Sequence, residues 1–147
     1  MSITGNNLPV YANNTQNDVV SITGSAGALA SDLNGVIVYT AGSNGSRIYN
    51  VLLSTTDTSA DNIFLYIKTN GGSICPIGQI NIPASSGNLS SKVCIDALSA
   101  ANIAGLPFDE AQKPYIELAP NASLKISLVA SPGTGSLIYA SAIGADY

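Results

Sequence analysis

Residues 63–72 read IFLYIKTNGG, a run in which aliphatic side chains alternate with others before a glycine-rich turn. Ile63, Leu65 and Ile67 occupy every second position, so an extended strand places them on one face and its aromatic and lysine side chains on the other. The Asn70–Gly72 run supplies residues that accept positive φ, as a tight hairpin turn needs. We therefore predict a β-strand packed on one side, followed by a hairpin.

Short β-compatible runs separated by turn residues continue on both sides of this hairpin. The next run, 74–82, contains Pro76, which cannot donate a ladder hydrogen bond and so predicts an edge strand or a bulge there. Alternation predicts that Tyr49, Val51 and Leu53 share one face of their strand. The other predicted strands cover residues 36–39, 47–54, 92–95, 115–118, 124–129 and 137–143.

About eight strands at this spacing, with almost no helix, predict an all-β sandwich, and a jelly roll is the preferred form. The long connection through residues 96–113 favours a Greek key over a simple meander. Within it, residues 96–103 are the one stretch that could hold a short helix. Leu124, Ile126 and Leu128 are expected to face the core.

The N-terminal segment differs from the rest of the chain. Residues 1–30 contain scattered Asn and Thr and little apolar sequence, so we predict an extended arm there and a single β-sandwich domain over residues 31–147. The stretch Val19–Ile22 could still form a first strand.

The composition restricts the classes of function. Charged residues make up 10% of the chain and hydrophobic residues 46%, so the outer surface must be largely neutral and readily packed against a partner. The net charge is −4 and the five cations are scattered, which argues against nucleic-acid binding. No apolar run is long enough for a membrane span and no secretory signal precedes the domain, so we expect a soluble product made in the cytosol.

The residues that usually perform catalysis are scarce. The chain has no histidine, so the usual base of hydrolases and the usual zinc ligand are missing, and we predict no enzyme, metal or cofactor. Asp57 and Asp61 could offer two carboxylates to calcium, but a solvated loop is the preferred interpretation. Asp109 and Glu110 are adjacent, so they point apart on an extended chain and do not resemble glycosidase carboxylates.

Two further residue types leave alternatives open. Cys75 and Cys94 are interpreted as small apolar side chains on neighbouring strands, with a single disulfide between them as the alternative. The tyrosines could form a sugar-binding platform, although packing within the sandwich is favoured for those in predicted strands. The tyrosines are Tyr11, Tyr39, Tyr49, Tyr66, Tyr115, Tyr139 and Tyr147.

The order of these segments resembles the head decoration, or capsid cement, proteins of tailed bacteriophages. The resemblance spans roughly residues 36–147 and consists of strand and turn residues without a catalytic signature. It is carried by the runs GSRIYNVLLSTTDT (45–58), NIFLY (62–66), IGQINIPASSG (77–87), GLPFD (105–109), YIELAPNASLK (115–125) and IGADY (143–147).

This resemblance implies a trimer that docks on the outer surface of the assembled capsid and bridges neighbouring major capsid protein subunits. We expect Leu8, Pro9, Val10 and Tyr11 of the arm to contact the capsid or an adjacent subunit. The alternative is a receptor- or glycan-binding module of a tail fibre or head appendage, which would share the neutral sandwich surface.

Overall fold

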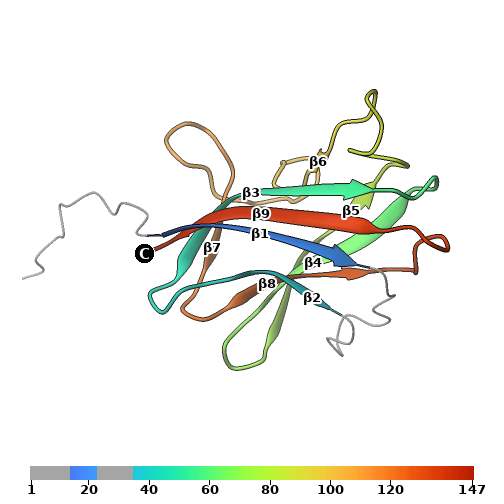
Figure 1. Ribbon diagram of the computed structural model, residues 1–147. Coiled ribbons are helices and arrows are strands. Elements are labelled where there is room, and N and C mark those ends of the chain that lie inside the picture. The colour runs from blue at the N-terminus through green and yellow to red at the C-terminus, as the bar shows by residue number, and fades with distance from the viewer. Residues whose placement is uncertain (1–13, 23–34) are drawn as a thin grey trace, which may run out of the picture.

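The computed structural model describes residues 14–22 and 35–147, and within them the protein is an all-β sandwich without a helix (Figure 1). This confirms the predicted fold class. The strands are β1 (Asn14–Ile22), β2 (Val36–Thr40), β3 (Ser46–Thr55), β4 (Asp61–Lys68), β5 (Ile74–Ile82), β6 (Ile95–Asp96), β7 (Ile116–Leu118), β8 (Ser123–Leu128) and β9 (Ile138–Asp146).

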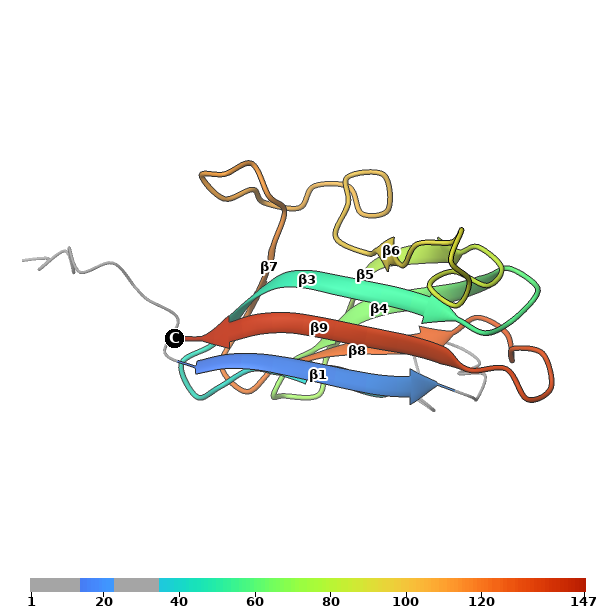
Figure 2. The same ribbon diagram turned by 45° about the horizontal axis from the view of Figure 1, so that its top comes forward.

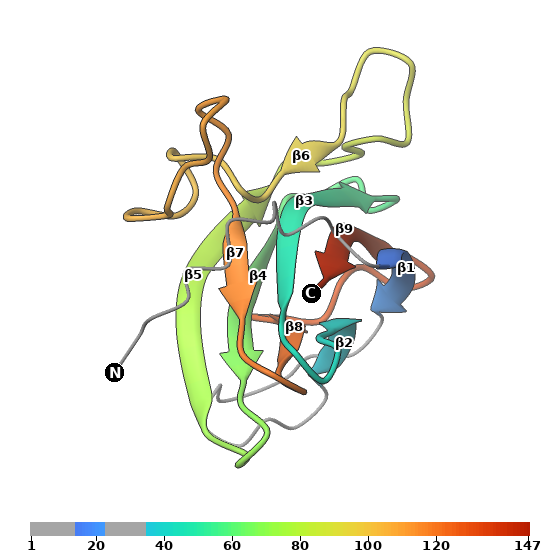
Figure 3. The ribbon, with the colours of Figure 1, turned by 90° about the vertical axis from the view of Figure 1, so that its left-hand side faces the viewer.

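The strands form two antiparallel sheets that lie face to face, as the end-on view in Figure 3 shows. Sheet A has the order β1-β9-β3-β6, and β7 also pairs with β3. Sheet B has the order β2-β8-β4-β5. Strands that follow each other in the chain repeatedly lie in different sheets, so long crossovers replace simple hairpins. The jelly-roll form stays a prediction that is consistent with this order.

The β4–β5 hairpin matches its prediction. Gly72 has a φ of 87° and its amide donates to the Thr69 carbonyl at 2.9 Å, which closes the turn. β5 is an edge strand of sheet B, and its register with β4 shifts where Pro76 pairs with Tyr66. The proline therefore lies at an edge and beside a bulge, as predicted.

The core lies between the two sheets. Leu124, Ile126 and Leu128 are fully buried, which confirms their predicted orientation. Tyr39 is also fully buried, and its ring lies so close to β9 that a Cβ at Gly144 would sit 2.8 Å from it. Burial of one such large side chain stabilises the fold by about 1.5–3 kcal/mol.

The predicted orientation of Tyr49 is wrong, because β3 contains a bulge. The register of β3 with β9 shifts between Ile48 and Asn50, so the residue between them leaves the alternation. Val51 is buried in the core, whereas Tyr49 is 43% exposed. The bulge redirects a tyrosine that alternation alone placed with Val51.

Three other predictions need comment. The suggested strand at Val19–Ile22 is confirmed and begins earlier, at Asn14, so part of the predicted arm belongs to sheet A. The strand predicted at 92–95 is reduced to the two residues of β6. The possible helix at 96–103 is wrong, because the chain forms turns there. These turns still bury Leu98 and Ile103 in the core, so the segment needs no helix to bury its apolar side chains.

Candidate interaction surfaces

The arm residues predicted to make contacts, Leu8, Pro9, Val10 and Tyr11, lie outside the described residues. Their role stays a prediction. In the described part of the chain we consider two surfaces with features of an interaction site, one on sheet A and one in the connection between β6 and β7. We treat them in turn.

The first surface is the outer face of β1, β9 and β3, the strands that lie side by side in Figure 2. Cross-strand pairs share a face of a sheet, and the buried alanines of β9 define the inner one. We call the part of this outer face beyond the β3 bulge the neutral face, because none of its described side chains carries a charge. Its members are Val19, Ser21, Asn50, Leu52, Ser54, Tyr139, Ser141 and Ile143.

The neutral face combines exposed apolar groups with small polar ones. Val19 is 69% exposed and Ile143 is 39% exposed, so the face offers two aliphatic side chains for burial against a partner. Tyr49 borders the face at the β3 bulge. Charge lies at its borders, where Asp96 of β6 pairs with Leu52 and where Arg47, before the bulge, pairs with Glu117 of β7. An uncharged and partly apolar surface resembles the centre of protein interfaces, where charged residues are depleted.

Asn50 gives this face a polar centre. It pairs with Ile143 across the bulge, and its side-chain oxygen Oδ1 is shielded from solvent. No described residue donates a hydrogen bond to that oxygen. A shielded acceptor without a donor costs about 1–3 kcal/mol, so a rotation that turned this amide towards a partner's donor would remove a local cost.

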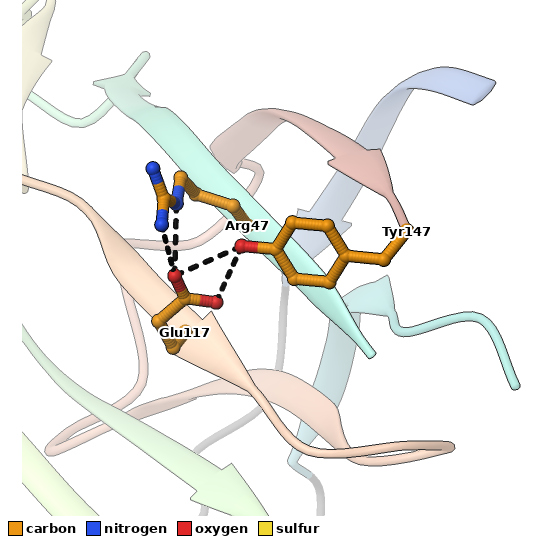
Figure 4. Close-up of polar contacts among 3 residues, drawn as sticks. All are labelled: Arg47, Glu117 and Tyr147. Carbon is orange, nitrogen blue, oxygen red and sulfur yellow. Dashed lines mark hydrogen bonds and ion pairs between the residues drawn. The ribbon is translucent and has the colours of Figure 1, made fainter. Parts of the chain in front are cut away.

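One end of sheet A is fastened by three side chains that are far apart in sequence (Figure 4). Glu117 accepts hydrogen bonds from Nε of Arg47 at 2.9 Å and from the hydroxyl of Tyr147 at 2.7 Å. Burial and the hydrogen bond to Glu117 raise the pKa of Tyr147 to about 12. The cluster ties β3, β7 and the residue after β9 together, and it uses the charge of the only arginine.

The second surface belongs to the connection between β6 and β7, part of which projects from the body of the protein (Figure 2). We call residues 107–115 the finger. Its arms are joined by a bridge between Phe108 and Pro114 and by a hydrogen bond from the Tyr115 amide to the Pro107 carbonyl at 3.1 Å. The Asp109 side chain accepts from the Lys113 amide at 2.8 Å. The finger is therefore a braced loop.

A groove of about 480 Å³ lies at the base of the finger. It is open to solvent and includes Phe108, which is 51% exposed. Its lining residues are Arg47, Phe108, Asp109, Glu110, Ala111 and Tyr115. The guanidinium of Arg47 lies 4.1 Å from the centroid of the Tyr115 ring, within cation–π range.

Asp57 and Asp61 do not lie in a solvated loop, so that interpretation is wrong. Both are buried and line a cleft of about 260 Å³. Asp57 accepts hydrogen bonds from the Gly133 and Ser59 amides, which lower its pKa. Burial raises the pKa of Asp61, which accepts from the Thr55 hydroxyl at 3.0 Å. The hydrogen bonds of Asp57 connect its own loop to the loop that contains Gly133. Both of its carboxylate oxygens already accept from backbone amides.

The cysteine interpretation is also wrong. Cys75 and Cys94 are both exposed thiols. A Cβ on Gly87 would meet both Cys94 and Ser54, so Cys94 lies near the end of β3, whereas Cys75 pairs with Ile67 at the far end of β4. Several residues of strand, roughly 20 Å, separate those positions, and a disulfide needs Cα atoms within about 7 Å.

The tyrosines divide into buried and accessible groups. Tyr39 and Tyr66 are fully buried, so neither can form a sugar-binding platform. Tyr115 carries Arg47 on its ring. Tyr49 remains the tyrosine with a strongly exposed side chain among the described residues, and Phe108 is the other exposed aromatic there.

In residues 14–22 and 35–147 no helix is long and apolar enough to cross a membrane. The same residues contain no group of three or more histidine, cysteine or acidic side chains that could hold a metal ion. No protein-family model matches the chain, and no curated protein matches its sequence. The two surfaces described above are therefore the basis for a functional proposal.

Proposed function

We propose that the protein decorates the outer surface of a tailed-bacteriophage capsid, as a trimer that bridges neighbouring major capsid protein subunits. It would be made in the host cytoplasm and added to the assembled virion. The segment resemblance suggests this role, and the neutral face is the observation that supports it best. The proposal involves no catalysis and no cofactor.

The neutral face suits contact between like-charged molecules. Each copy carries a net charge of −4, so two copies repel each other at most surfaces. On the neutral face Val19 and Ile143 can be buried without bringing carboxylates together. This combination favours self-association or contact with an equally neutral coat surface through sheet A.

The size of the face favours assembly on a lattice. About five residues on each of three strands cover roughly 240 Å², from a strand spacing of about 4.8 Å and a rise of about 3.3 Å per residue. A standard interface buries about 800 Å² on each partner. The neutral face therefore supplies about a third of one, and repeated contacts around a trimer and with the coat would add the rest through effective concentration.

Such binding would stabilise the shell. A protein that binds the assembled lattice and not the free coat subunits shifts the equilibrium towards the lattice, in proportion to the difference in binding free energy. A decoration protein needs only surfaces that match the assembled geometry.

The test combines mass-resolved light scattering with binding to mature virions that lack the protein. We expect a trimer in solution, saturable binding in hundreds of copies per particle, and greater resistance of the particle to heat. A monomer that does not bind virions would contradict the proposal.

The alternative is a receptor- or glycan-binding module. The structure reduces its support, because Tyr39 and Tyr66 are buried and, among the described residues, the exposed aromatics are scattered. Binding to a glycan array with loss of the signal on Tyr49→Ala would favour this alternative over decoration.

A further inference from the structure

We propose that the groove at the base of the finger binds an arginine side chain of a partner protein. The groove would hold the guanidinium between acidic side chains and the apolar stem against Phe108. This inference rests on the proposed function only in assigning the arginine to a protein partner.

The charge of the groove is the first argument. Its one cation, Arg47, is already paired with Glu117 and stacked on Tyr115. Asp109 and Glu110 form no ion pair with any described residue. The groove therefore keeps two carboxylates without a counter-ion, and it would repel an anionic ligand and attract a cationic one.

The apolar part of the groove narrows the choice of cation. Phe108 is half exposed beside the carboxylates, so a ligand that carries a flat cation on a hydrocarbon stem would contact both. A guanidinium binds a carboxylate through two parallel hydrogen bonds and stacks on an aromatic ring, whereas an ammonium is more strongly hydrated. Both properties favour arginine over lysine.

The finger is preorganised, because hydrogen bonds already hold its backbone. The hydrogen bonds from the Gln112 amide to the Asp109 carbonyl at 3.0 Å and from the Asp109 amide to the Lys113 carbonyl at 2.9 Å hold its tip. Contacts with Arg47 hold its base, since that side chain covers Tyr115. Little conformational entropy remains to be lost on binding, which strengthens an otherwise small contact.

The test uses the purified full chain and two small probes. N-acetyl-L-arginine amide carries the guanidinium, and N-acetyl-L-citrulline amide has nearly the same shape without the charge. In an NMR titration we expect the arginine probe to shift the amide signals of residues 108–113 and 115 with a Kd on the order of 10 mM, a weak affinity suited to one contact within a multivalent assembly. The citrulline probe should bind at least about fivefold more weakly.

Variants on exposed positions locate the site. Glu110→Gln should weaken arginine binding about threefold, and Phe108→Ala should weaken it by a similar factor, as expected for an exposed ion pair and an exposed cation–π contact. Asp96→Asn is the matched control, because Asp96 is exposed but lies outside the groove, and it should leave binding unchanged.

Equal binding of the two probes, or no effect of Glu110→Gln, would overturn the inference. Stronger shifts with a neutral disaccharide such as maltose would also overturn it, in favour of a sugar site. These results are separable from the capsid proposal, since arginine binding by a protein that ignores virions contradicts only that proposal.

Discussion

The neutral face is part of sheet A, whereas the finger is a loop that projects from the body (Figure 2). The face has no charge among its described side chains and depends on the hydrogen bonds of three strands. The finger carries Asp109, Glu110 and Lys113 within a few residues and is held by its own local hydrogen bonds.

This difference indicates a division of roles. The uncharged face contributes buried apolar area, which strengthens a contact. The charged finger contributes electrostatic complementarity, which orients the partner and selects among partners. The predictions below test whether the two surfaces act separately, starting with the largest expected effect.

Charge on the neutral face should weaken the proposed self-association. We expect Val19→Lys combined with Ile143→Lys to weaken the proposed trimer roughly 100-fold, because burying unpaired ammonium groups costs several kcal/mol. Sedimentation equilibrium would measure this. Ile37→Lys is the matched control, since Ile37 is 48% exposed on sheet B, and it should leave the trimer intact. Phe108→Ala should also leave it intact, and loss of the trimer there would show that the surfaces are not separate.

The support beneath the neutral face should be sensitive to one methyl group. Gly144→Ala places a Cβ 2.8 Å from the Tyr39 ring and 2.9 Å from the Arg47 carbonyl oxygen, so β9 or the ring must move. We expect a loss of about 1–3 kcal/mol in the free energy of unfolding, measured with urea. Gly71→Ala has space for its Cβ and should change the free energy by less than about 0.5 kcal/mol. Equal effects would contradict the close approach.

The Glu117 cluster joins the two surfaces, and its removal should have a small effect. Both partners are partly exposed, so Glu117→Gln should cost about 0.2–1 kcal/mol. It should also lower the pKa of Tyr147, because a hydrogen bond to a carboxylate that favours the neutral phenol is weakened. An ultraviolet titration, with Tyr147→Phe to assign the signal, would measure the change, and an unaltered pKa would refute the contact.

The same tyrosine sets a pH dependence. Its pKa in the folded protein is about 12, above the ordinary value of 10.0, so its contribution to stability is complete below pH 10. That contribution is lost as the pH rises towards 12. Tyr147→Phe should remove this part of the alkaline loss, as measured by urea unfolding across the range.

The most local effect should be confined to the finger and should leave the stability of the whole protein nearly unchanged. Asp109→Ala removes the acceptor of the Lys113 amide, so hydrogen exchange of that amide should accelerate by about tenfold. Amides of β9 should keep their protection. Faster exchange in both places would mean that the finger and sheet A do not open independently.

The strands and several turns could be predicted from local sequence. Alternation at Ile63, Leu65 and Ile67, and the glycines after Asn70, carry their information within a few residues. Pro76 excludes a central strand by its missing donor. These signals depend only on neighbours in the chain, so they remain visible without a structure.

The surfaces could not be predicted in the same way. Arg47 and Glu117 are 70 residues apart, and Asp57 and Gly133 are 76 apart, so only the fold brings them together. The bulge that exposes Tyr49 depends on pairing with β9, which no local pattern reveals. The sequence shows that residue 57 is a charged aspartate, but it does not show that the fold buries it.

The amide oxygen of Asn50 gives the neutral face a means of discrimination. Because the oxygen is shielded and lacks a donor among the described residues, a partner could reach it only after the side chain turned outward. The turned amide could accept an N–H or O–H group, and a partner that supplied one would remove the cost of the missing donor. A purely aliphatic partner would gain nothing from that rotation, so the face should select partners that carry one correctly placed donor.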